Sequence, residues 1–84
     1  MECNFGVDSR GDALLLEVQG RVQLNFAEVA FSNGEVQVVD FEERPRQSGF
    51  YRLLDFADGR HVKTVRLLAR SRSNETRLNL YMSK

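Results

Sequence analysis

Apolar and polar residues alternate with a period of two along much of this chain. The clearest example covers residues 21–26, in which every second residue is apolar, and residues 14–19 and 77–82 follow the same pattern. A period of two places successive side chains on opposite faces of a β-strand, so each run predicts a half-buried strand. The side chains expected to face inward are Leu14, Leu16, Val18, Val22, Leu24, Phe26, Leu78, Leu80 and Met82.

Two dipeptides predict tight turns between such strands. Asn33-Gly34 and Asp58-Gly59 each separate two runs rich in β-branched and aromatic residues. Both dipeptides suit a type I′ turn, because both central residues need a positive φ and glycine, asparagine and aspartate tolerate it best. We therefore expect one hairpin between the run ending at Phe31 and a strand over 35–42. A second hairpin is expected between 49–56 and the run that starts at residue 60.

Other breaks in the pattern predict turns and bulges. The stretch DSRGD, residues 8–12, is expected to be a turn after a first short strand over 3–7, and Gly20 to break or bulge the chain. After Phe26 the inward parity shifts to Val29 and Phe31, and an extra residue near Ala27-Glu28 explains the shift. Residues 43–49, which contain the only proline, are expected to form the main loop.

Residues 60–72 admit two interpretations. As a strand, Val65, Leu67 and Ala69 face inward and the arginines face outward. As a helix, at about 100° per residue, Val62, Val65 and Ala69 also share one side. The preceding Asp-Gly turn and the β-branched residues in this run favour the strand.

The predicted fold is all-β. Residues 1–84 are expected to form a single domain, an antiparallel small barrel or two-sheet sandwich of six to seven short strands. The alternative is an α+β fold in which residues 60–72 are helical. The single cysteine excludes an internal disulfide, so a homodimer formed by pairing edge strands is a plausible way to add buried area.

The formal net charge of zero conceals two blocks of opposite sign. Residues 1–43 carry a net charge of −7 and residues 44–84 carry +7. A block of this kind suits a nucleic-acid or acidic protein partner. The simpler interpretation is that acidic and basic strands lie side by side and neutralise each other.

The basic half supplies the candidate binding residues. A small barrel that binds single-stranded nucleic acid combines cationic side chains with aromatic rings on which bases stack. The candidates for such a surface are Arg52, Lys63, Arg66, Arg70, Arg72 and Tyr81. Most of the six phenylalanines are expected in the core.

Catalytic and metal chemistry find little support in the sequence. One cysteine and one histidine show no metal-ligand spacing, no glycine-rich phosphate loop occurs, and we expect neither a metal nor another cofactor. His61, with Asp58 to orient it, is the only candidate base of a nucleophilic site, so we expect no enzyme activity. With no long apolar run and no secretory signal, we expect no membrane span and a cytoplasmic location.

These observations predict a small non-enzymatic protein-interaction module, with a protein partner or a second copy as its ligand. The alternative is a small β-barrel that binds single-stranded nucleic acid through its basic half.

Overall fold

The computed structural model describes residues 2–42, 44–71 and 75–83, and these residues form strands and no helix. Six antiparallel strands make one sheet in the order β3-β2-β5-β1-β6, and β4 pairs with β2 beyond this path. The bounds are β1 (Glu2–Gln19), β2 (Val22–Phe31), β3 (Val36–Asp40), β4 (Pro45–Arg46), β5 (Gly49–Ser71) and β6 (Arg77–Ser83). The predicted all-β class is therefore confirmed.

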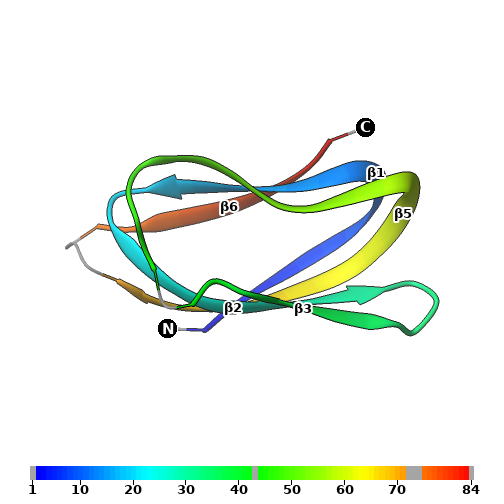
Figure 1. Cartoon of the computed structure of the whole chain (residues 1–84), viewed down its shortest axis with the longest axis horizontal. Helices are drawn as coiled ribbons and strands as arrows, with labels where there is room; N and C mark the ends of the chain where they lie inside the picture. The colour runs from blue at the N-terminus through cyan, green and yellow to red at the C-terminus, as the bar shows by residue number, and fades with distance from the viewer. Residues whose placement is uncertain (1, 43, 72–74, 84) are drawn as a thin grey trace.

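The sheet curls strongly into a half-barrel because its two longest strands bend. β1 has 18 residues and β5 has 23, and the two pair along most of their lengths. In Figure 1 both strands turn back at one end of the molecule, so that each contributes to two facing layers. One layer also contains β6, and the other also contains β2 and β3. The expected small barrel is thus present in a half-closed form.

The turn predicted over residues 8–12 is wrong, because β1 runs through it. The β1–β5 register shifts between Gly6 and Ser9, where β1 contains one residue more than β5. Asp8 takes up this extra residue with a φ of 42°, a left-handed conformation that aspartate tolerates better than most residues. A polar, glycine-containing stretch suits a bulge as well as a turn, and here pairing with β5 selects the bulge.

The second predicted hairpin is also wrong. Residues on both sides of Gly59 belong to the same strand, β5, and pair with β1 rather than with each other. Gly11 pairs with Arg60 and Ala13 pairs with Asp55, so the intervening part of β5 bulges where the strand bends. Gly59 has a φ of 72°. Glycine adopts such a positive φ easily, both at a bend within a strand and in a hairpin turn, so the same dipeptide fits either structure.

The Asn33-Gly34 hairpin is confirmed, with a different turn. β2 and β3 pair around it, and Phe31 N–H donates to Glu35 C=O at 2.9 Å. Gly34 N–H donates to Phe31 C=O at 3.0 Å, and Gly34 has a φ of 92°. Asn33 does not have the positive φ that a type I′ turn requires. These contacts describe a three-residue loop in which glycine takes the left-handed position.

The bulge predicted in β2 lies two residues earlier than expected. The β2–β5 register shifts between Leu24 and Phe26. Ala27 and Val29 are therefore fully buried, whereas Phe26 turns to the outer face and is half-buried. The inward orientation predicted for Phe26 is wrong because the extra residue precedes it.

The helical alternative for residues 60–72 is wrong, and so is the α+β fold that depended on it. The described part of this segment, up to Ser71, is the second half of β5 and lies between β1 and β2. Val62, Val65, Leu67 and Ala69 are buried, whereas Arg66 and Arg70 are exposed. Hydrogen bonding to two neighbouring strands favours the extended conformation where periodicity alone is ambiguous.

One core fills the space between the two layers. Buried side chains from both halves of β5 and from the second half of β1 belong to it, and Cys3, Phe5 and Val7 from the first half of β1 pack against it. The rings of Phe31 and Phe56 meet edge to face at 5.6 Å. Its fully buried members with the largest side chains are Leu14, Leu16, Leu24, Leu67, Val18, Val22, Val29, Val62 and Val65. Leu78, Leu80 and Met82 of β6 pack against it and are half-buried, as their pattern predicted. Within the described ranges, no helix is long and apolar enough to cross a membrane.

Candidate functional site

The strand order places the basic half of the chain between acidic neighbours. Arg66 of β5 pairs with Glu28 of β2 at 2.5 Å and with Glu2 of β1 at 2.9 Å. The hydrogen bonds that Arg66 donates to Glu28 and, to a lesser extent, to Glu2 raise the pKa of its guanidinium above the ordinary value. Arg66 therefore neutralises acidic groups of its own chain on both sides.

A second arginine of the basic half, Arg60, pairs with a carboxylate of the acidic half near the bend of β5. Arg60 pairs with Glu35 at 2.8 Å and lies 3.8 Å from the centroid of the Phe31 ring. The hydrogen bond from Arg60 lowers the pKa of Glu35. His61 contacts Asp8 at 2.6 Å. The two charge blocks thus interdigitate across neighbouring strands, as the simpler interpretation of the sequence expected.

The predicted binding residues do not gather on one surface. Arg66 and Arg70 lie on the outer face of the second half of β5, while Arg52 lies on its first half and Tyr81 on β6. Both halves of β5 turn their inner faces to one shared core, so their outer faces point in opposite directions. Lys63 is exposed on the second half of β5, and Arg72 lies outside the described residues.

His61 lies within β5 and not on an open turn. Its ring contacts Asp8 of β1, and the side chain of Asp58, the expected partner, lies outside the described part of the structure. Its side chain is 38% exposed. In the described part of the chain, no three histidine, cysteine or acidic residues come together in a way that could hold a metal ion.

A pair of exposed aromatic rings occupies the outer face of the β5–β1–β6 layer. Phe50 is 65% exposed and Tyr81 is 46% exposed, and their ring centroids are 6.0 Å apart with an interplanar angle of 46°. Leu15 lies between Arg52 and Tyr81 in the register, and Glu17 lies between Phe50 and Asn79. We call Leu15, Phe50 and Tyr81, together with Glu17, the aromatic patch.

Glu17 holds the Tyr81 ring in place. The Tyr81 hydroxyl donates to Glu17 Oε1 at 2.9 Å, and the Asn79 amide donates to the same oxygen at 3.3 Å. The hydrogen bond to Glu17 raises the pKa of Tyr81 above its ordinary value, because ionisation would break the bond and oppose two negative charges. The Tyr81 ring of the patch is therefore held at its hydroxyl group.

Sequence reasoning found half of this patch. Tyr81 is among the predicted binding residues and Phe50 is not, because most of the six phenylalanines are expected in the core and the sequence does not show which ones are exposed. The usable signal was parity, since Phe50 and Arg52 are two residues apart in one strand and share a face. Its pairing with Tyr81 depends on β1 lying between β5 and β6, which no local pattern reveals.

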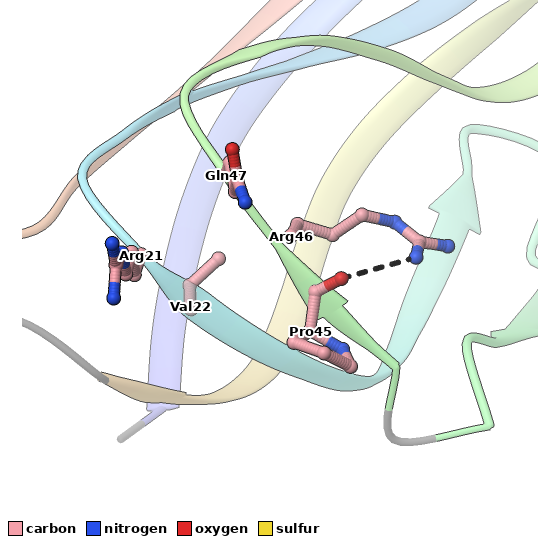
Figure 2. Close-up of a pocket in the computed structure, with 5 residues that line it drawn as sticks. All are labelled: Arg21, Val22, Pro45, Arg46 and Gln47. Atoms are coloured by element: carbon pink, nitrogen blue, oxygen red, sulfur yellow. Dashed lines mark hydrogen bonds between the residues drawn. The ribbon is translucent and has the colours of Figure 1, made fainter.

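A shallow hollow lies where β2 begins, beside β4 (Figure 2). It measures about 380 Å³ and is lined by Arg21, Val22, Pro45, Arg46 and Gln47. The Arg46 guanidinium lies over the Tyr51 ring at 5.6 Å, and the Tyr51 hydroxyl donates to Gln47 C=O at 2.7 Å. These contacts fasten the segment around β4 to the sheet, and the lining offers no cluster of polar groups aimed at a ligand.

No known protein family, curated protein or solved structure matches this chain.

Proposed function

We propose that this protein is a small non-enzymatic interaction module that binds a protein partner through the aromatic patch. The observation that carries the proposal is the exposure of Phe50 and Tyr81 as a packed pair on the outer face of the sheet. Large aromatic side chains are the usual energetic anchors of protein interfaces. A ring that moves from water into an interface contributes roughly 1.5–3 kcal/mol.

The surroundings of the patch suit a protein partner. Leu15 adds apolar surface between the rings and Arg52, and Glu17, Asn79 and Arg52 surround it with polar groups. An apolar centre with a polar rim is the usual anatomy of a protein interface. Because Tyr81 is already fixed by Glu17, binding would cost little side-chain entropy.

The charge layout favours a protein over single-stranded nucleic acid. Nucleic-acid binding needs cations that are available to phosphates and that lie beside the stacking rings. Arg66 is held by two carboxylates, and it lies on the second half of β5, whereas Phe50 lies on the first half. Beside the rings, Arg52 is paired with Asp55 at 3.4 Å.

The test compares the wild-type protein with a Phe50→Ser/Tyr81→Ser variant. A Leu68→Ser variant is the control, because it removes half-buried apolar surface from the second half of β5, away from both the aromatic patch and strand β3. Circular dichroism establishes that all three proteins fold. Each of the three proteins is then cross-linked to the proteins that bind it. The recovered complexes are identified and quantified by mass spectrometry.

At least one partner should be retained by the wild type and the control and reduced at least about tenfold in the patch variant. Equal recovery by all three proteins would overturn the proposal. Oligonucleotide binding that weakens steeply with added salt and is lost with Arg70→Glu would favour the nucleic-acid alternative instead.

A further inference from the structure

Strand β3 lies at an edge of the sheet. It pairs with β2 on one side, and no other described strand pairs with its second side. The register from Phe26–Asp40 to Ala30–Val36 contains no shift, so the strand is regular over its five residues. β4 pairs farther along β2, with Val22 and Gln23, and does not cover β3.

The register shows which backbone groups are free. Glu35 C=O accepts from Phe31, and Phe41 N–H donates to Asn25 C=O at 3.0 Å, so residues 35 and 41 point towards β2. In an antiparallel pair the direction of the backbone groups alternates along the strand. Gln37 and Val39 therefore also point towards β2, and Val36, Val38 and Asp40 point their N–H and C=O groups away from the sheet.

The same edge exposes apolar side chains. Val36 is 60% exposed and Val38 is 59% exposed, and both lie on the outer face. On the inner face, Val39 and Phe41 pack against the rim of the core and are half-buried. Natural edge strands are usually blocked by lysine, proline or a bulge. β3 contains none of these features, and Asp40 at its end is its only charged residue.

We infer that β3 pairs with β3 of a second copy of this chain, antiparallel and about a two-fold axis at Val38. In this register Val38 lies opposite Val38 of the second copy, and Val36 lies opposite Asp40. Every outward backbone group of the strand then has a partner. The surface involved is separate from the aromatic patch, so the inference goes beyond the proposed function.

The charges at this edge permit a second copy. Glu35 is paired with Arg60 at 2.8 Å, and Glu42 is paired with Arg44 at 3.1 Å, so the acidic residues at both ends of the strand are already neutralised. Asp40 would face a valine, and no like charges would lie directly opposite each other. In the joined sheet, Val39 and Phe41 of both copies would lie on one continuous inner face.

Oligomeric state over a wide range of protein concentration tests this inference. Sedimentation should show a wild-type dimer that dissociates on dilution. Val38→Lys should weaken the dimer at least about tenfold, because it puts two like charges opposite each other on the axis. Ser32→Lys adds the same charge in the adjacent loop and should leave the dimer unchanged.

Single cysteines test the register. In a Cys3→Ser background, Val38→Cys should form a disulfide-linked dimer on mild oxidation. Val36→Cys should cross-link efficiently only when mixed with Asp40→Cys. Circular dichroism checks the fold of each variant.

Three results would overturn the inference. The first is a wild type that stays monomeric at every concentration, even if it binds an extended basic peptide at the β3 edge. The second is a dimer that Val38→Lys leaves intact. The third is a dimer lost only with Phe50→Ser/Tyr81→Ser, which would place self-association on the aromatic patch.

Discussion

The protein's two tyrosines differ because their hydroxyl partners differ. Tyr51 is half-buried and donates to the main-chain carbonyl of Gln47, which fastens the segment around β4. Tyr81 is exposed and donates to the carboxylate of Glu17, which fixes the aromatic patch. Because the Glu17 carboxylate opposes the loss of the Tyr81 proton, the pKa of Tyr81 shows whether this hydrogen bond in the patch is formed.

Glu17→Gln should lower the pKa of Tyr81 towards the ordinary tyrosine value of about 10. The raised pKa in the folded protein means that this hydrogen bond stabilises the fold fully below about pH 10. That stability is lost as pH rises through the pKa of the folded protein. Alkaline absorbance titration of a Tyr51→Phe protein, in which Tyr81 is the only tyrosine, measures the shift. An unchanged midpoint in Glu17→Gln would contradict the assigned bond.

Gly11 allows β6 to lie close to β1. A β-carbon at this position would collide with the main-chain oxygen of Ser83 and with the side chain of Met82. Gly11→Ala should therefore lower the free energy of unfolding by about 1–3 kcal/mol, as overpacking generally does. Urea unfolding measures this, with Gly6→Ala as the control, because a β-carbon at Gly6 has no neighbour within 4 Å. Equal stability of the two variants would contradict the close approach.

At the scale of elements, local signals identified strands but not where the long strands end. Asn33-Gly34 and Asp58-Gly59 look alike in sequence, yet the first closes a hairpin and the second lies within β5. The difference comes from β1, which lies alongside both halves of β5 and keeps them from pairing with each other. Which residues are adjacent across the sheet, including Phe50 and Tyr81, depends on the same long-range pairing.

Gly59→Ala should destabilise the protein by about 1–2 kcal/mol, the usual cost of a left-handed conformation for an L-residue. Its added β-carbon would have neighbours no closer than 3.5 Å, so conformation rather than collision causes the loss. Gly59→Asn should recover part of the stability, because asparagine tolerates positive φ. Thermal unfolding compares the two variants, and identical losses would argue against backbone strain at the bend.

At the scale of the whole molecule, the strand order converts a lopsided charge distribution into neutral neighbourhoods. The sequence showed the two charge blocks, and the expectation that they neutralise each other side by side holds for Arg66 and Arg60. Which residues form the pairs was not predictable, because β2 lies far from β5 in the chain and next to it in the sheet.

Arg66→Glu should therefore destabilise the protein more than Arg70→Glu. The first substitution places a third carboxylate between Glu2 and Glu28, whereas Arg70 lies opposite the uncharged Gln23. Added salt should reduce the difference in unfolding free energy between the two variants, since it screens the repulsion between exposed carboxylates. Urea unfolding at low and high ionic strength measures both effects, and equal stabilities at low salt would contradict the pairing.

The bending of β1 and β5 through both layers has a consequence for local opening. Because β1 and β5 run through both layers, one layer cannot separate from the other without breaking the β1–β5 ladder. The molecule should behave as a single cooperative unit, in which the slowest amides open only by global unfolding. Native-state hydrogen exchange should thus give similar opening free energies for the paired amides at both ends of β5, including those beside Leu53 and those beside Leu67.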